Sequence, residues 1–132
     1  MNSQRLPISW CELQNHSDDR GGLRVVNFIE LPFSPKRFFS VSVSKSMQER
    51  GGHSHKECWQ MLYAIQGNIQ VQIAIDNSIS SFSLTEDGPG LIVPPGYWAK
   101  QIFLTSFSIL GVMASHPFNP DDYVHEIPPV FN

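Results

Sequence analysis

Residues 68–75, Asn68-Ile69-Gln70-Val71-Gln72-Ile73-Ala74-Ile75, decide the fold class of this chain. Ile69, Val71 and Ile73 occupy every second position, with polar or small residues between them. This alternation is typical of a β-strand that packs one face and leaves the other partly wet. Asp76-Asn77-Ser78 follows, and Asn and Asp accept the left-handed backbone angles of a tight turn. The stretch therefore predicts a strand that continues into a hairpin.

The rest of the chain repeats this pattern in shorter segments. Helical periodicity is nearly absent, and short apolar runs are bounded by Gly, Pro, Asn and Ser. Further strands are expected at 23–29, 38–44, 60–65, 80–84, 90–93, 100–103 and 107–114. About eight such strands suit a closed all-β sandwich.

The length of 132 residues fits one domain, 1–132. No internal repeat or interdomain linker interrupts it. Residues 117–132 contain Pro120, Pro128 and Pro129, and proline cannot donate to a strand ladder. We therefore expect this Pro-rich C-terminal segment to form a strap rather than a strand.

Composition and charge exclude several classes of function. The net charge is −3, and the nine basic residues are scattered, so we expect no nucleic-acid partner. No apolar run approaches the length of a bilayer span, so we expect no membrane partner. Cys11 and Cys58 show neither a disulfide framework nor Cys-x-x-Cys spacing, which favours reduced thiols. We expect a cytoplasmic protein.

The stretch Arg50-Gly51-Gly52-His53-Ser54-His55-Lys56 is where the sequence predicts chemistry. In an extended strand, side chains at positions i and i+2 share a face, so both imidazoles would point into one cavity, about 6–7 Å apart. Imidazole exchanges protons near neutral pH. The pair indicates either metal ligation or proton transfer.

Around these histidines the spacing resembles the cupin pattern, a glycine before His-x-His followed by a glutamate and then a glycine. The glutamate position falls on Gln60 and the final glycine on Gly67. In the second cupin motif, Pro95-Gly96 matches, but the position of the third histidine holds Ala99. A catalytic metal normally needs at least three protein ligands. We therefore predict no metal site.

A closer resemblance extends over almost the whole chain. The residues that carry it are Asp19-Arg20-Gly21-Gly22-Leu23, Pro32-Phe33-Ser34-Pro35-Lys36-Arg37, the histidine stretch, Gly90-Leu91-Ile92-Val93-Pro94-Pro95-Gly96-Tyr97-Trp98, Ala114-Ser115 and Asp122-Tyr123. With these, the sequence resembles the sugar-nucleotide 3,4-ketoisomerases. That family consists of metal-independent cupins that act on dTDP-4-keto-6-deoxyglucose and also occur as a domain in WxcM-like proteins.

The resemblance implies an antiparallel jelly roll (the cupin or double-stranded β-helix fold) and a homodimer. It also implies an isomerase that acts on a dTDP-linked 4-keto-6-deoxysugar in deoxysugar or polysaccharide biosynthesis. A base removes the acidic C3 proton to give an enediolate, and a proton returned to C4 moves the keto group to C3. No cofactor is required by this reaction.

Carried over to this sequence, the family roles make His53 and His55 the acid/base pair, and which of them takes the first proton stays open. A guanidinium pairs bidentately with phosphate oxygens, and aromatic rings stack on a sugar or thymine. The candidates for substrate binding are Arg20, Arg50, Gln60, Tyr97 and Trp98.

The sequence departs from this family at four positions, which hold Phe39, Ser40, Ala99 and His125. Family members usually carry tyrosines at the first two positions, a histidine at the third and an arginine at the fourth. Two alternatives therefore stay open: a non-catalytic cupin that binds sugar nucleotides, and a metal-dependent cupin dioxygenase. The related 3,5-epimerases rely on a His–Asp dyad that the sequence does not place.

Overall fold

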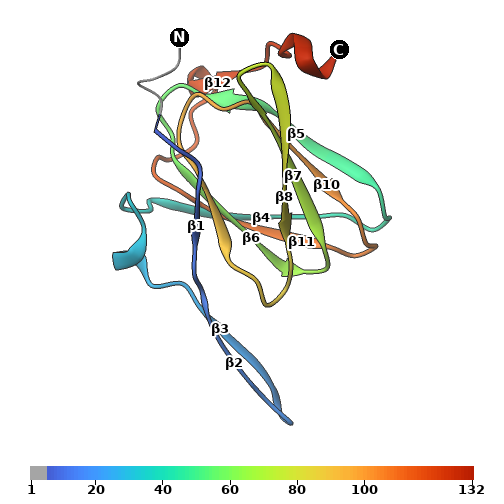
Figure 1. Ribbon diagram of the computed structural model, residues 1–132. Coiled ribbons are helices and arrows are strands. Elements are labelled where there is room, and N and C mark those ends of the chain that lie inside the picture. The colour runs from blue at the N-terminus through green and yellow to red at the C-terminus, as the bar shows by residue number, and fades with distance from the viewer. Residues whose placement is uncertain (1–5) are drawn as a thin grey trace.

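Two five-stranded antiparallel sheets face each other in the computed structural model, which describes residues 6–132 (Figure 1). The first sheet has the order β1-β9-β6-β11-β4, with β1 Ser9–Cys11, β9 Gly90–Val93, β6 Gln60–Gln66, β11 Ile109–Ala114 and β4 Arg37–Ser42. The second has the order β12-β5-β10-β7-β8, with β12 Tyr123–Val124, β5 Gln48–His55, β10 Ala99–Phe103, β7 Ile69–Ile75 and β8 Ser78–Leu84. The predicted antiparallel jelly roll is confirmed.

The segment that predicted the fold forms β7 and the turn after it. Ile69, Val71 and Ile73 are fully buried, as the alternation requires. Ile75 pairs with Ser78, so the turn between β7 and β8 contains only Asp76 and Asn77. Asp76 has a φ of 55°, a left-handed angle that Asp tolerates better than most residues. The predicted hairpin is confirmed, and β8 begins earlier than position 80 because the turn is so short.

The main core lies between the two sheets. It contains Leu62 and Ala64 of β6, Phe103 of β10, and Leu110 and Val112 of β11, all buried, together with the inward side chains of β7. A buried side chain of this size contributes about 1.5–3 kcal/mol relative to its exposed state. The two sheets are therefore held face to face by apolar side chains along most of their length.

A second apolar cluster covers the outer face of the first sheet. Met61 and Ile92 pack there with Cys11, Leu13 and Leu31. The strand expected over 23–29 ends at Val25, and Phe28–Glu30 is a 3₁₀ turn instead. The prediction was wrong at that end because the chain bends to bury Leu31 in this cluster, which leaves Ile29 94% exposed.

Two short strands form an arm outside the barrel. β2 Gln14–Asp18 and β3 Gly21–Val25 pair only with each other and extend away from the two sheets (Figure 1). Every residue of β2 is exposed, and Leu23 of β3 is 60% exposed. Single-sequence patterns missed β2 because neither of its faces is apolar. The arm buries little of itself in this chain.

The C-terminal segment 117–132, called the strap below, contains a short strand at the β5 edge of the second sheet, where the sequence predicted no strand. Tyr123 and Val124 form β12, which pairs with the edge of β5 and satisfies backbone groups that would otherwise be open. The 3₁₀ turns Pro120–Asp122 and Pro129–Phe131 flank it. No helix within residues 6–132 has the length and apolar character needed to cross a membrane.

Candidate active site

His53 and His55 lie side by side at one end of the barrel, on the face of β5 that points between the sheets. Their ring centroids are 5.1 Å apart and the rings are nearly perpendicular, at 85°. On one side β5 pairs with β10, where Ala99 lies opposite His53. On the other it pairs with β12, where Tyr123 lies opposite His55. The prediction that both imidazoles share one face is confirmed.

The two glycines before the pair shape the strand at this point. Gly51 and Gly52 have φ angles of 86° and 87°, which residues with a Cβ rarely adopt. A Cβ on Gly51 would come within 2.6 Å of Oε1 of Gln101 on the neighbouring strand. The pairing register of β10 with β5 shifts between Ala99 and Lys100, opposite this stretch. The glycines thus set a bulge that aims the histidines inward.

His55 is held by a carboxylate from the strap. Its Nδ1 lies 2.9 Å from Oδ2 of Asp122, and the His55 side chain is only 7% exposed. Oδ1 of Asp122 accepts a hydrogen bond of 2.7 Å from the backbone N–H of Glu57. Because a carboxylate only accepts hydrogen bonds, the neutral ring carries its proton on Nδ1 and leaves a lone pair on Nε2. Nε2 is buried and has no hydrogen-bond partner within residues 6–132.

The pKa values of this pair describe a neutral imidazole beside an ionised carboxylate. Burial lowers the pKa of His55, and the hydrogen bond to Asp122 opposes that shift only in part. Burial raises the pKa of Asp122, but the hydrogen bonds from Glu57 and His55 outweigh it, so the net shift is downward. A neutral His55 can therefore accept a proton, and Asp122 would stabilise the imidazolium that results.

His53 is also neutral near pH 7. Burial is the largest cause, and the neighbouring His55 and His125 add to it, which lowers the pKa of His53 to about 4. Tyr123 packs against both histidines, with its ring centroid 4.7 Å from that of His53 and 4.6 Å from that of His55. Two neutral imidazoles thus share one site and can act as proton acceptors.

A cavity of about 150 Å³ opens beside His53, between the two sheets. Phe39, Val41, Leu110 and Val112 form its apolar wall. Its polar lining consists of Arg50, His53, Gln60, Gln101 and Tyr123. A smaller cavity of about 20 Å³ lies next to both histidines, Cys58 and Tyr97. His55 lines only the smaller cavity, so His53 is the histidine that faces the larger one.

The structure brings some of the predicted binding residues to this cavity and places others elsewhere. Arg50 and Gln60 line the larger cavity. Tyr97 lines the smaller one, and its hydroxyl donates a hydrogen bond of 2.6 Å to the carbonyl of Leu6. Trp98 lies outside, 8% exposed, with its ring centroid 4.5 Å from that of Phe131 in the strap.

Trp98 belongs to a separate pocket of about 350 Å³ on the outer face of the second sheet. Arg50, Lys100 and Phe131 also line this outer pocket. Arg50 therefore lines both the outer pocket and the cavity beside His53.

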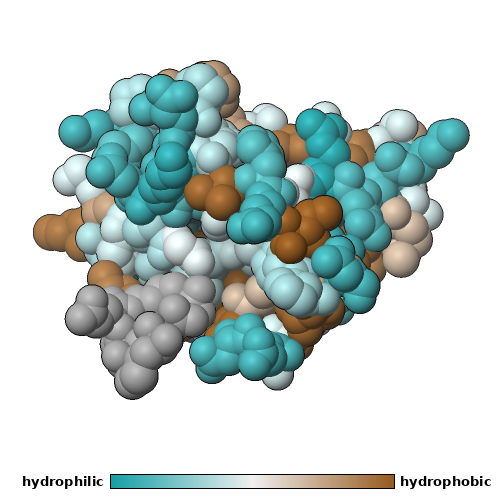
Figure 2. Space-filling model, turned by 90° about the horizontal axis from the view of Figure 1, so that it is seen from above, coloured by the Kyte–Doolittle hydropathy of each residue, from teal (hydrophilic) through white to brown (hydrophobic). Residues whose placement is uncertain are grey.

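Viewed from the end that carries β12, the surface is mostly hydrophilic, with separate hydrophobic groups between the polar ones (Figure 2). The predicted contact of Trp98 with a ligand thus depends on this outer pocket and not on the histidine cavity.

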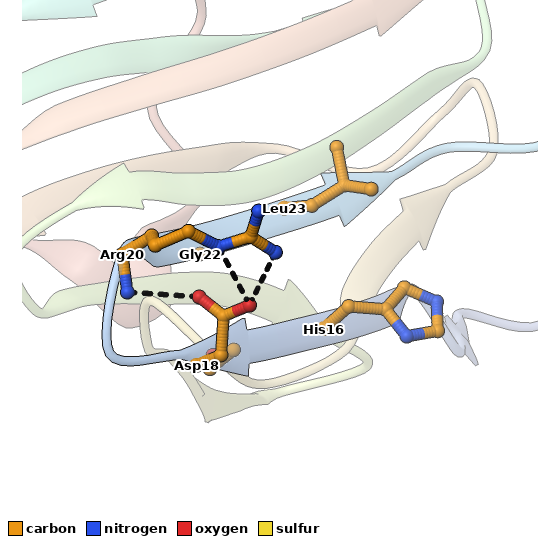
Figure 3. A pocket seen from close by; sticks show the side chains of 7 residues that line it. His16, Asp18, Arg20, Gly22 and Leu23 are labelled. Atoms are coloured by element: carbon orange, nitrogen blue, oxygen red, sulfur yellow. Dashed lines mark hydrogen bonds and ion pairs between the residues drawn. The ribbon is translucent and has the colours of Figure 1, made fainter.

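Arg20 lies in the turn between β2 and β3 of the arm, beside Asp18 (Figure 3). Its guanidinium donates to Oδ2 of Asp18 at 2.6 and 3.1 Å, and its backbone N–H donates to Oδ1 at 2.9 Å. The side chain of Arg20 is 88% exposed. Within one chain, Arg20 is separate from the cavity that His53 and Arg50 line.

Sequence reasoning missed four residues of this site: Arg37, Asp122, Tyr123 and His125. Arg37 stacks over Phe39 at 5.0 Å and contributes to the lowered pKa of His55. The other three come from the strap. The sequence marked Asp122 and Tyr123 only as part of a family motif, and His125 only as a departure from the family. The His–Asp pair that the sequence did not place is thus formed by His55 and Asp122.

The positions that hold a metal in other cupins do not fit one here. Ala99, the Cα partner of His53, has no ligand atom, and the amide of Gln60 stands in place of a carboxylate. Within residues 6–132, one other set of potential ligands, His55, Cys58 and Asp122, has its donor atoms within 4.8 Å of one another. That set contains the Nδ1–carboxylate contact that orients His55.

Comparison with known proteins gives one consistent result. The family model for FdtA, described as WxcM-like, C-terminal, matches residues 7–129. The TDP-4-oxo-6-deoxy-alpha-D-glucose-3,4-oxoisomerase of Aneurinibacillus thermoaerophilus is 30% identical over 110 residues, which cover 83% of this chain and 79% of the relative.

Two solved structures share the fold over nearly the whole chain. A sugar 3,4-ketoisomerase from Thermoanaerobacterium thermosaccharolyticum in complex with TDP superimposes with a TM-score of 0.83 at 25% identity, over 90% of this chain and 88% of the other. A 3,4-ketoisomerase from Helicobacter canadensis gives a TM-score of 0.81 at 26% identity, over 90% of both chains.

Proposed function

The chain belongs to the FdtA family of WxcM-like C-terminal domains, and on that premise we propose that it is a sugar-nucleotide 3,4-ketoisomerase. Its substrate is a TDP-linked 4-keto-6-deoxyhexose, which it converts to the 3-keto isomer. The observation that carries the proposal is the pair of neutral imidazoles, 5.1 Å apart, at a cavity of about 150 Å³. Proton transfer of this kind needs a neutral base at the reacting carbon.

We assign the first proton to His53, because it is the histidine that lines the larger cavity. The C4 carbonyl acidifies the C3–H bond, and when His53 takes that proton the electron pair forms an enediolate. A proton delivered to C4, together with transfer of the hydroxyl proton from O3 to O4, then leaves the carbonyl at C3 and a hydroxyl at C4. Numbers of atoms, electrons and protons are unchanged between substrate and product, so no redox cofactor takes part.

His55 and Asp122 support this reaction from the wall of the cavity. Asp122 fixes the His55 ring with Nδ1 as donor, at 2.9 Å, so Nε2 presents its lone pair towards the smaller cavity. Arg37 adds positive charge near this pair. Positive charge and oriented imidazoles stabilise the negative charge that develops on the enediolate oxygens.

The nucleotide is proposed to bind at the mouth, where Arg50 connects the cavity with the outer pocket. A guanidinium there suits a pyrophosphate, and the keto sugar would enter the cavity towards Gln60. The aromatic pair of Trp98 and Phe131 lines the outer pocket. On this proposal Phe131 is the ring available to the thymine, and Trp98 supports it from beneath.

The arm supports the expected homodimer. A two-stranded ribbon is marginally stable in water by itself, and this one exposes Leu23 along with its backbone. A second copy of the chain packed against the arm would cover these groups. Arg20 takes its expected role at a pyrophosphate only if the arm extends to the partner's site, because within one chain it lines a different pocket from the one that His53 lines.

Reduced cysteines support the expected cytoplasmic location. Cys11 and Cys58 are both buried and neither forms a disulfide. Cys11 also has a raised pKa, chiefly because it is buried, so its thiol stays protonated and unreactive. We propose that the reaction takes place in a reducing compartment.

The test is proton NMR of the purified protein with TDP-4-keto-6-deoxyglucose in deuterated buffer, with His53→Ala and His55→Ala alongside. A 3-keto product formed by the wild type and lost in the variants supports the proposal. Binding of the nucleotide with neither product nor exchange at C3 would overturn it in favour of a non-catalytic sugar-nucleotide cupin. The lack of a hydroxyl at Phe39 in the cavity wall is the observation that favours this second function.

A further inference from the structure

His53 and His55 differ in their access to water. Only His53 has an exposed imidazole, that of His125, beside it. His55 is buried, its Nδ1 is bound to Asp122, and its Nε2 faces the smaller cavity. His53 is only partly buried, and the exposed imidazole of His125 lies next to it, with ring centroids 6.0 Å apart at 64°. A route for protons between the site and bulk water therefore starts from His53.

The pairing of β12 with β5 explains the position of His125. Tyr123 lies opposite His55 and Val124 opposite Ser54, so continuation of the register sets His125 opposite His53. Tyr123 and His125 are two residues apart and share a face of the strand. Their rings are stacked, 6.0 Å apart at 14°. Tyr123 thus lies next to both His53 and His125.

The spacing suits transfer through water. The rings of His53 and His125 meet edge-on, with centroids 6.0 Å apart at 64°, and a single water molecule can bridge ring nitrogens at this range. An imidazole can accept a proton on one ring nitrogen and release one from the other, and an exposed ring can exchange these protons with bulk water. His125 has this exposure, whereas His53 does not.

We propose that His125 is a positioning residue that passes protons between bulk water and His53 during the reaction. This inference rests on the proposed ketoisomerase function and adds the origin of the hydrogen that reaches C4. His53 takes the C3 proton while the C–H electron pair moves into the enediolate. The imidazolium of His53 then gives its proton to His125 through water, His125 releases one to bulk water, and a solvent proton returns by the same route to C4. One proton leaves and one enters.

Other charged groups near His53 cannot take this role. His55 lies on the same strand but is closed off by Asp122. Arg50 lines the cavity and Arg37 lies near His55, and a guanidinium stays protonated at any working pH. From β10 and β6 the cavity receives only the amides of Gln101 and Gln60. The phenol of Tyr123 also lines the cavity and packs against His53, but it is less exposed than His125. Among the residues that the structure describes around His53, His125 is the imidazole exposed to water.

The test follows a deuterium label. Substrate deuterated at C3 is converted in ordinary water by the wild type and by His125→Ala, His125→Arg and His16→Ala. In the wild type the label is expected to wash out to solvent. In His125→Ala and His125→Arg, transfer of the label from C3 to C4 is expected to rise at least about fivefold, because a proton held on His53 returns before it exchanges. His16→Ala, an exposed histidine on the arm, should behave as the wild type.

The Arg variant separates proton transfer from charge. It keeps a positive charge near His53 but cannot release a proton at neutral pH. If His125→Arg washed the label out like the wild type while His125→Ala did not, the residue would act through charge alone, and the relay would be overturned. Unchanged label transfer in both variants, with normal turnover, would overturn it as well while leaving the ketoisomerase standing.

A second measurement needs no turnover. NMR titration of the His53 ring in the free protein should show a pKa raised by about half a unit in His125→Ala, because a neighbouring like charge is removed, and no change in His16→Ala. An unchanged pKa of His53 in His125→Ala would mean that the two rings are not coupled, and would overturn the inference. A wild type that binds TDP but gives neither product nor exchange would instead overturn the proposed function, and the relay with it.

Discussion

The histidine end of the barrel and the β2–β3 arm both carry residues of the predicted site, but the fold holds them in different ways. At the histidine end, β5, β10 and β12 bring side chains from distant parts of the sequence within contact of His53 and His55. On the arm, Arg20 contacts Asp18, only two residues away, and is exposed (Figure 3). The histidine end is organised by long-range contacts within the chain. The contact of Arg20 is local, and the arm is tied to the barrel at its base, where Asn15 and Arg24 donate to the backbone carbonyls of Asp87 and Ala64.

This difference indicates where function can be assigned from a single chain. Buried side chains such as His55 have an orientation set by several partners, so their chemistry can be derived from their surroundings. The orientation of Arg20 is set by its own turn, so its role depends on a second copy or a ligand. Variants at the histidine end should therefore affect catalysis itself, and variants on the arm should affect binding or assembly.

The largest expected effect is the loss of the base. His53→Gln should lower kcat by about 10³-fold, because a general base contributes roughly 10²–10⁴ to the rate. The change keeps a polar side chain in a partly buried position, so the melting temperature should fall little. Steady-state kinetics by NMR or coupled assay measures kcat. His16→Gln on the arm is the matched control, and a comparable loss in that variant would break the distinction between the two regions.

The second effect tests the orientation of His55. Asp122→Asn should lower kcat by about 10²-fold, because an amide can donate to Nδ1 and so place the ring proton on Nε2. The neighbouring Asp121→Asn is the control, since the side chain of Asp121 is exposed and Asp122 alone contacts His55. Full activity of Asp122→Asn would show that the carboxylate only supports the strap.

Much of the barrel follows from the sequence because its strands bury one face. The expected ranges 60–65, 68–75 and 90–93 match β6, β7 and β9 to within one residue, and apolar alternation or a continuous apolar run marks each of them. β5 was expected to be extended only around His53 and His55, and β1, β2 and β12 were not expected. These three strands are short and have no apolar alternation. They are extended because they pair with a neighbouring strand.

The residues of the site could likewise be predicted only where the pattern within one strand determines their position. The spacing of His53 and His55 predicted their common face, since a strand alternates at each residue. Asp122 could not be assigned a role, because its contact with His55 depends on where the strap crosses β5. Of the two substituted positions on β4, Phe39 faces the cavity and Ser40 is exposed on the opposite face, so only the change at Phe39 bears on the site.

The third prediction concerns pH and the stability of the histidine end. The pKa of His53 is lowered to about 4 in the fold, chiefly by burial, from an ordinary value of 6.5. The unfolded chain therefore binds more protons in this range. Stability should be greatest above pH 6.5, fall as the pH drops towards 4, and level off below. After allowance for solvent screening, the loss should be about 1–2 kcal/mol.

Chemical denaturation of the wild type and His53→Gln at pH 7 and pH 4.5 measures this effect. The decrease in the free energy of unfolding should be smaller in the variant. His55 has a shift of the same direction and contributes to what remains. Asp122, whose pKa is lowered from 3.8, affects stability only at still lower pH. An equal decrease in both proteins would mean that His53 is not buried in the neutral form.

The smallest effect is expected on the arm. Arg20→Ala should raise KM about fivefold with kcat nearly unchanged, because loss of a phosphate contact weakens the ground state and the transition state alike. Arg50→Ala, at the mouth of the cavity, should raise KM more, since Arg50 lies next to His53 in the same chain. An arm that serves assembly alone would leave KM unchanged in Arg20→Ala, while Leu23→Asp would shift the protein towards monomer in sedimentation velocity. If both arm variants matched the wild type in KM and in oligomeric state, the arm would have no part in the site, and catalysis would be complete within one chain.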